Sequence, residues 1–231
     1  MGLSARPRTL VIGSSALALA TAVTAFAATA DAGSRPPFTL VAASKDVVPV
    51  QRWDTYLDLS NLGLDVTTGD KPVEIWASRD NYSSPVTATM RIGEGRRAKV
   101  TKLPDGLVNL QGLQDFAHVT MVDAAGKTKL DLNPGYCGGS GWVSDPVKLG
   151  PDSPEENPYP SGGCSWQPFS HRTVFGFQSS YGFPLSLDTW SGSDLPDTSE
   201  EALPDGRYDL TVSVGQQWRK LLGLSPDQGR V

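Results

Sequence analysis

Few side chains in this sequence could carry out acid–base or metal chemistry. The chain contains two histidines, His118 and His171, so a metal site with three imidazole ligands cannot be built from it alone. Ser170, His171 and Asp188 supply the residue types of a hydrolase triad. The Gly-Gly-Ser-Gly-Trp run at 138–142, however, lacks the closing glycine of a nucleophile elbow. We therefore expect no catalytic residues and no resident metal in this chain.

Neither the acidic pairs nor the glycines of the sequence indicate a calcium or phosphate site. Asp194 with Asp197 and Glu200 with Glu201 lie in a polar stretch, where solvation explains them, and the twelve-residue spacing of a calcium-binding loop is absent from the sequence. No glycine-rich phosphate loop follows an expected strand. We therefore expect no cofactor.

The composition narrows the class of protein. The chain has 231 residues, with 25 acidic against 20 basic side chains and a formal net charge of −5. This sign is the opposite of what neutralising nucleic-acid phosphates requires, so nucleic acid is excluded as an expected partner. The 24 glycines, 18 prolines and 19% charged residues argue against a coiled coil or helical bundle.

Residues 1–32 have the pattern of a secretory signal peptide. Arg6 and Arg8 precede an apolar stretch rich in alanine, and small residues then alternate up to Ala32, after which we expect cleavage. The alternative is an N-terminal membrane anchor, which the alanine-rich composition and the lack of a positive flank make less favoured. We therefore predict a secreted, extracellular protein with no stable membrane insertion after cleavage.

The elements that would position any site are predicted to be short antiparallel strands. Residues 85–92 and 207–214 alternate apolar and polar side chains with a period of two, as half-buried strands do. Similar short patterns recur between turn residues at 38–42, 47–53, 56–59, 73–77, 98–102, 117–123, 128–132, 173–177 and 185–190. The one helical pattern covers 216–222 and is followed by Gly223 at a capping position.

These patterns predict an all-β fold, an antiparallel immunoglobulin-like sandwich with one short helix near the C-terminus. We expect residues 33–52 to be an N-terminal linker or first strand. Residues 53–231 then form the β-sandwich domain, which we expect could be truncated at its C-terminus.

The two cysteines, Cys137 and Cys164, are predicted to form one disulfide. Cysteines of an exported chain pair more often than they stay free, and no Cys-x-x-Cys spacing suggests redox activity. The segment between them is rich in glycine, proline and serine, so the bond would close a long loop without regular structure.

Five of the six tryptophans separate into two groups, and the sixth, Trp218, lies in the helical pattern. Trp53 and Trp76 lie in strand patterns and are predicted to be core residues. The aromatic residues in or near the loop between the cysteines are possible binding residues: Trp142, Tyr159, Trp166 and Trp190. They could form a platform for a sugar or protein, or they could be the small core of the loop itself.

An ordered set of motifs resembles a known family. It comprises Leu-Gln-Asp-Phe-Ala-His at 113–118, an Asp-Ala-Ala-Gly-Lys hairpin at 123–127, Tyr-Cys at 136–137, the second cysteine, and Leu-Pro-Asp-Gly-Arg-Tyr at 203–208. In order and spacing these resemble secreted actinobacterial proteins of the lysyl oxidase family, most closely the N-terminal region of the two-module members. The resemblance runs from about Trp53 to Leu224.

The resemblance implies a β-sandwich and a copper-amine-oxidase ancestry. In the catalytic module of that family, alternate histidines precede the Asp-Phe-Ala stretch at places similar to Val108, Leu110 and Gly112 here. None of these three residues is histidine. The resemblance therefore carries no copper ligand over to this chain.

Two functions of different classes follow. The first is a secreted, non-catalytic β-sandwich binding or accessory module. Its expected partner is an extracellular peptide or a cell-wall glycan, because acidic residues beside the loop favour a cationic or neutral partner. The alternative is the front part of a copper-dependent amine (lysyl) oxidase, acting on CH–NH2 groups, whose catalytic copper module is missing from this chain.

The disulfide generates the first testable prediction. Cys137→Ser should destabilise the fold by about 3 to 4 kcal/mol, because the loop of the unfolded chain is no longer closed. The melting temperature should fall by several degrees, which calorimetry measures. Two titratable thiols in the native secreted protein would contradict the pairing.

Overall fold

The computed structural model describes residues 36–42, 48, 50–53, 56–59, 62–137, 146–159, 169–185, 187, 199 and 201–231. By its internal contacts the chain divides into two units, 1–33 and 34–231. Every described residue belongs to the second unit, so the expected signal peptide at 1–32 lies outside the described residues. No helix in the described ranges is long and apolar enough to cross a membrane.

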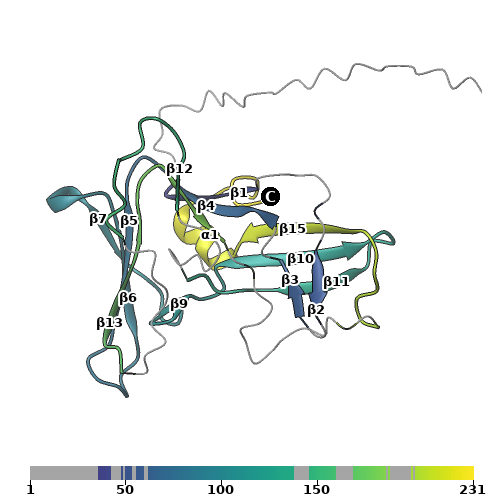
Figure 1. Ribbon diagram of the computed structural model, residues 1–231. Helices are drawn as coiled ribbons and strands as arrows, with labels where there is room; N and C mark the ends of the chain where they lie inside the picture. Colours follow the sequence, from purple (N-terminus) through teal and green to yellow (C-terminus); the bar gives the residue numbers. More distant parts are fainter. Residues whose placement is uncertain are drawn as a thin grey trace, which may run out of the picture. The chain divides into compact units, whose positions relative to one another are not determined.

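Three antiparallel sheets make up most of the described fold (Figure 1). The first has the order β1-β4-β14-β12, formed by β1 (Phe38–Ala42), β4 (Leu64–Thr68), β14 (Tyr181–Pro184) and β12 (Val147–Lys148). The second has the order β13-β5-β6-β7, formed by β13 (Arg172–Phe177), β5 (Val73–Ser78), β6 (Thr87–Ile92) and β7 (Lys99–Lys102). The third has the order β11-β10-β15, formed by β11 (Thr128–Leu132), β10 (Ala117–Asp123) and β15 (Tyr208–Val214).

Smaller elements complete the described fold. Two strand pairs join β2 (Gln51–Trp53) to β3 (Tyr56–Asp58) and β8 (Val108–Asn109) to β9 (Gly112–Leu113). A 3-10 turn, η2 (Gly95–Arg97), connects β6 to β7. One helix, α1 (Gln216–Leu222), follows β15.

Period-two burial explains why these segments are strands. In β10, Ala117, Val119 and Met121 are buried, while His118 and Thr120 between them are only partly buried. One face of the strand can therefore pack on the core while the other meets solvent. The β10–β11 hairpin turns at 124–126, where the Gly126 amide donates to the Asp123 carbonyl.

The three sheets contribute to one hydrophobic core, in which leucine is the commonest residue and five phenylalanines are buried. Phe38 of β1 and Phe177 of β13 meet edge to face, with ring centroids 4.8 Å apart. Phe183 of β14 lies 5.2 Å from Phe177, and Phe116, just before β10, lies 6.1 Å from Phe38. All four rings are fully buried. Rings from separate sheets therefore interlock in the geometry that aromatic pairs prefer.

The predicted helix has the expected bounds. Trp218 is completely buried in α1, and its indole Nε1 donates to the Gln114 carbonyl at 2.8 Å. Gly223 ends the helix with a φ of 66°, a left-handed conformation that glycine adopts without strain. The chain approaches closely at Gly215, where a Cβ would lie 1.9 Å from the Asp115 carbonyl oxygen, so the start of the helix lies against the segment that leads into β10.

The all-β antiparallel sandwich with one short C-terminal helix is thus confirmed. Its immunoglobulin type stays a prediction. Residues 38–42, within the segment expected to be a linker or first strand, form β1, whose Phe38 belongs to the core.

Two strand predictions differ from the structure, and the strands β4, β8, β9 and β12 were not predicted. The strand expected at 185–190 is wrong in its described part, because Leu185 and Leu187 are buried outside any strand and the strand lies earlier, at β14. At 47–53 only β2 forms a strand among the described residues. In β4, Thr67 and Thr68 are polar yet buried. Thr68 Oγ1 donates to the Gln178 carbonyl at 2.5 Å, which offsets the burial of its hydroxyl.

The buried tryptophan of α1 offers a test of this packing. We expect Trp218→Ala to lower the free energy of unfolding by about 3 to 5 kcal/mol, because a large cavity replaces the ring. Urea denaturation measures this loss. The matched control is Trp76→Ala at a 38% exposed position, which should cost clearly less. Equal losses for the two variants would contradict the assignment of Trp218 to the core.

Candidate functional site

The outward-facing side of the β13-β5-β6-β7 sheet carries the candidate site, and we call it the outer face. Along β5, Val73, Ile75 and Ala77 are buried, so Glu74 and Trp76 lie on the opposite side of the strand. The register places Val174 of β13 directly beside Trp76. Two segments distant in sequence, β5 and β13, therefore meet on this face.

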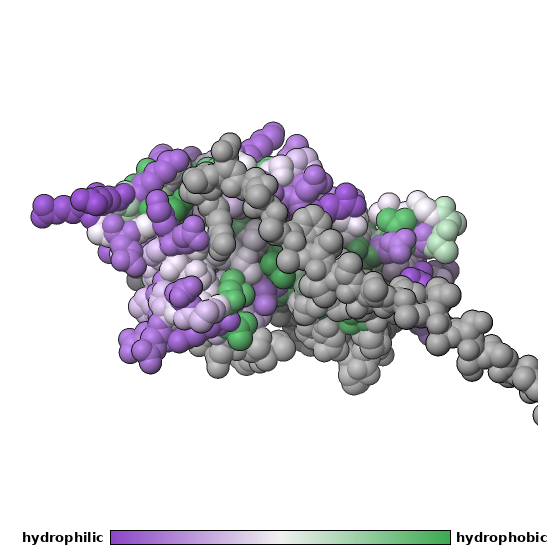
Figure 2. Space-filling model, turned by 90° about the horizontal axis from the view of Figure 1, so that it is seen from above, coloured by the Kyte–Doolittle hydropathy of each residue, from purple (hydrophilic) through white to green (hydrophobic). Residues whose placement is uncertain are grey.

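The outer face exposes apolar side chains. Trp76 is 38% exposed, Val174 is 40% exposed, and Val100 of β7 is 63% exposed. On the surface seen in Figure 2, the coloured hydrophobic residues lie in small separate patches among hydrophilic ones. Trp76 and Val174 are partners in the β5–β13 register, so two of these exposed apolar side chains are neighbours.

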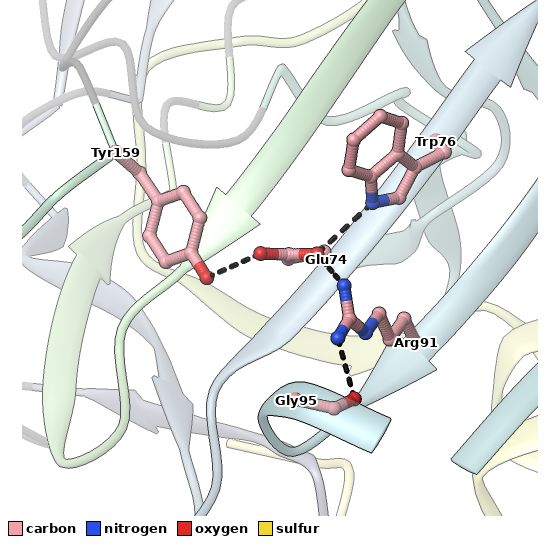
Figure 3. A network of polar contacts seen from close by, with 5 residues as sticks. All are labelled: Glu74, Trp76, Arg91, Gly95 and Tyr159. Atoms are coloured by element: carbon pink, nitrogen blue, oxygen red, sulfur yellow. Dashed lines mark hydrogen bonds and ion pairs between the residues drawn. The ribbon is translucent and has the colours of Figure 1, made fainter. Parts of the chain in front are cut away.

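A polar network holds the tryptophan in place (Figure 3). The indole Nε1 of Trp76 donates to Glu74 Oε2 at 3.0 Å, and the Tyr159 hydroxyl donates to Glu74 Oε1 at 2.9 Å. Arg91 forms an ion pair with Glu74 Oε2 at 3.5 Å and also donates from Nη2 to the Gly95 carbonyl at 2.7 Å. Glu74 therefore accepts from both aromatic neighbours and is paired with a cation.

Tyr159 lies on the sheet where a glycine leaves room for its ring. Gly176 of β13 stands opposite Glu74 in the register, and a Cβ at this glycine would lie 1.9 Å from Tyr159 Cδ1. Any other residue at Gly176 would displace the tyrosine. Burial, and next the hydrogen bond to Glu74, raise the pKa of Tyr159 above its ordinary value.

A second aromatic group lies where β5 ends and β13 begins. The ring of Tyr82 lies 5.6 Å from that of Phe169 and 4.5 Å from that of His171. The Arg79 guanidinium lies 5.4 Å from the Tyr82 ring centroid and donates from Nε to the Ser170 carbonyl at 2.9 Å. Tyr82 and Phe169 are 56% and 69% exposed, so this group also faces solvent.

The predicted site residues are only partly covered by the described ranges. Trp142, Trp166, Trp190 and Cys164 lie outside them. Tyr159 is described, and its hydroxyl is engaged with Glu74. Cys137 is half-buried against the core, whereas Cys164 is not described, so the disulfide between these two residues stays a prediction.

The structure does not bring the two histidines to a common site. His118 pairs with Asp131 across the β10–β11 hairpin, with Nε2 to Oδ1 at 2.9 Å. His171 instead packs against Tyr82. In the described ranges no group of three or more His, Cys, Asp or Glu side chains could hold a metal ion.

Sequence reasoning placed Trp76 in the core, and this prediction is wrong, because the residue is 38% exposed. The signal that could have found it is the alternation itself. Val73, Ile75 and Ala77 already define the buried side of Val-Glu-Ile-Trp-Ala-Ser, so Trp76 must share the other side with Glu74. Tyr82 was missed because it lies in a turn without a periodic pattern.

No family model matches the chain, and neither a curated protein nor a solved structure matches it. The expected relation to the lysyl oxidase family therefore stays a prediction.

The raised pKa of Tyr159 predicts a loss of stability in alkali. The unfolded tyrosine ionises near its ordinary value of 10, whereas the folded one keeps its proton, so the unfolded state binds fewer protons above that pH. The contribution of Tyr159 to the free energy of unfolding is complete below pH 10 and is lost as the pH rises further. Urea denaturation at pH 8, 10 and 11 measures it.

Tyr159→Phe should reduce this alkaline loss of stability, because the phenolic proton is gone. Tyr82→Phe, which removes an exposed hydroxyl without touching Glu74, is the control. A Tyr159→Phe variant with the same dependence of unfolding free energy on pH as the wild type would contradict the burial of the hydroxyl beside Glu74.

Proposed function

We propose that this protein is a secreted, non-catalytic binding module that holds a neutral glycan chain on the outer face. The observation that carries the proposal is the exposed indole of Trp76, fixed by its hydrogen bond to Glu74. The signal-peptide pattern supports secretion.

The fixed indole suits recognition on energetic grounds. A side chain that is already ordered loses little conformational entropy on binding, so more of its contact energy appears as affinity. Trp76 is held at its Nε1, while more than a third of its surface stays open to solvent. A planar apolar surface of this kind matches the C–H face of a sugar ring.

The surroundings of Trp76 favour a neutral glycan over a cationic ligand. Glu74 and Arg91 neutralise one another within the face, with 3.5 Å between their charged atoms. Thr89 stands opposite Trp76 in the β5–β6 register and supplies a hydroxyl, and Lys102 follows on β7. Aromatic surface with a few polar groups around it is the usual make-up of a small-ligand site.

An extended peptide fits the β7 edge of this sheet less well than a glycan fits its outer face. Peptides commonly add as a strand to an open sheet edge. The β7 edge carries Lys99 and Lys102, and lysines on an edge strand discourage such pairing. A peptide is therefore the competing result for the experiment below.

The geometry of Glu74 supports binding without catalysis. Glycoside hydrolysis uses a pair of carboxyl groups, one as acid and one as base or nucleophile. Both oxygens of Glu74 already accept hydrogen bonds, from Tyr159 and from Trp76. This carboxylate therefore holds side chains in place.

Binding is tested by sedimentation with insoluble chitin, cellulose and purified peptidoglycan. We expect the wild type to sediment with at least one of them and Trp76→Ala to bind about tenfold more weakly, which corresponds to about 1.4 kcal/mol. Leu149→Ala, which truncates a 50% exposed side chain next to β12, is the matched control and should bind as the wild type does.

Melting temperatures of all three proteins are measured first, so that a folding defect is recognised. Equal sedimentation of folded Trp76→Ala and wild type would contradict the proposal. So would binding to an immobilised basic peptide together with no binding to any of the three glycans.

A further inference from the structure

A pocket of about 480 Å³ lies on the inner side of the same sheet, opposite the outer face. Its walls come from the turn after β4, from β6 and β7 with the turn between them, and from the C-terminal end of α1. The volume is in the range of small-molecule sites. The pocket and Trp76 belong to opposite sides of β5 and β6, so the inference below does not depend on the proposed glycan site.

Three cationic side chains line this pocket: Lys71, Arg97 and Lys99. All three are exposed, and none has an ion-pair partner in the part of the chain that the structure describes. Asp70 is the one carboxylate among the described lining residues. The formal charge around the pocket is therefore three positive and one negative, or +2, in a chain whose net charge is −5.

Lys99 lies on the side of the sheet that faces the core. It pairs with Ile92, and Thr101 pairs with Met90, so these β7 residues share the side of their β6 partners. Met90 is buried and Ile92 is half-buried. Lys99 is itself exposed, so its charge is accessible to a ligand that enters the pocket.

Apolar side chains form the rest of the wall. Ile92 reaches the pocket from β6, and Leu221 and Leu222 reach it from α1. Leu222 is 8% exposed, and Leu221 packs against the same core. A ligand that fills this pocket must therefore combine an anionic group with an apolar part.

Gln228 adds a polar group at the rim. Its side-chain Oε1 accepts from the Ser225 amide at 3.0 Å, and its backbone carbonyl accepts from Thr39 Oγ1 at 2.6 Å. The Nε2 group is then left as a donor. A phosphate offers several acceptor oxygens to such donors, and Arg97 can meet two of them at once.

We propose that this pocket binds a phosphate monoester with a short apolar chain. Lys71, Arg97 and Lys99 hold the phosphate, and the chain lies against Ile92 and Leu221. A phosphate monoester near pH 7 carries a charge of about −1.5 to −2, which balances the +2 of the pocket better than a carboxylate does. The phosphate could come from a soluble metabolite or from a lipid headgroup.

The test is calorimetric titration of the full secreted protein with hexyl phosphate, with hexanol and with inorganic phosphate. We expect hexyl phosphate to bind at least tenfold more tightly than either of the other two, because each contains only one half of the recognised chemistry. Arg97→Gln combined with Lys99→Gln should weaken hexyl phosphate binding at least tenfold. Leu221→Ala should weaken it while leaving the weak binding of inorganic phosphate unchanged.

Arg96→Gln is the matched control, because Arg96 precedes Arg97 in η2 and does not line the pocket. This variant should bind hexyl phosphate as the wild type does. Flotation with vesicles of phosphatidic acid in phosphatidylcholine, compared with phosphatidylcholine alone, distinguishes the sources. Flotation only with phosphatidic acid supports a lipid headgroup, whereas hexyl phosphate binding without flotation supports a soluble ester.

Two results would overturn the proposal. The first is equal binding of hexyl phosphate by the double variant and the wild type; self-association of that variant in sedimentation velocity would then assign Lys99 to protection of the β7 edge. The second is equal loss of binding in Arg96→Gln, which would show that general surface charge attracts the anion.

Discussion

Edge-to-face packing of phenylalanines is the interaction on which the described fold depends. Phe177 of β13 contacts Phe38 of β1 and Phe183 of β14, with ring centroids 4.8 and 5.2 Å away. Phe116, which leads into β10, reaches the same cluster through Phe38. The three sheets therefore share one hydrophobic core, and one side of each sheet packs against it. The side chains available to bind a ligand lie mainly on the opposite sides of the sheets.

The β13-β5-β6-β7 sheet shows the consequence most clearly. Its core side is anchored by Ile75 and Phe175, which stand opposite one another in the register, and its other side presents Trp76. A slip of one residue would exchange the two sides, so core packing also fixes the direction of the indole. Tyr159 then adds a long-range clamp, because its ring occupies the space above Gly176 and its hydroxyl reaches Glu74. On the core side of the same sheet, the cations Arg97 and Lys99 line a pocket together with the aliphatic side chains of Ile92, Leu221 and Leu222.

The sequence by itself determined the elements whose local pattern and burial agree. The strands β10 and β11 and the helix α1 have the bounds that periodicity predicts, because alternating or helical spacing of apolar residues is enough to commit one side to the core. The turn at Gly126 and the helix end at Gly223 were also predicted from the sequence, because both need a positive φ that glycine adopts without strain. The absence of a nucleic-acid partner, expected from the net charge, stays a prediction.

Tertiary structure alone decided which surfaces stay open and which distant residues meet. The alternation in β5 showed that Trp76 and Ile75 point in opposite directions, but only the packed sheets show that the side of Trp76 is left uncovered. Glu74 and Tyr159 are 85 positions apart, and no local pattern predicts their contact. The strand β4 is polar in part, and its buried Thr68 is satisfied by Gln178, 110 positions away. Such pairings depend on the burial of both partners at once, and burial is a property of the assembled sheets that no short segment carries by itself.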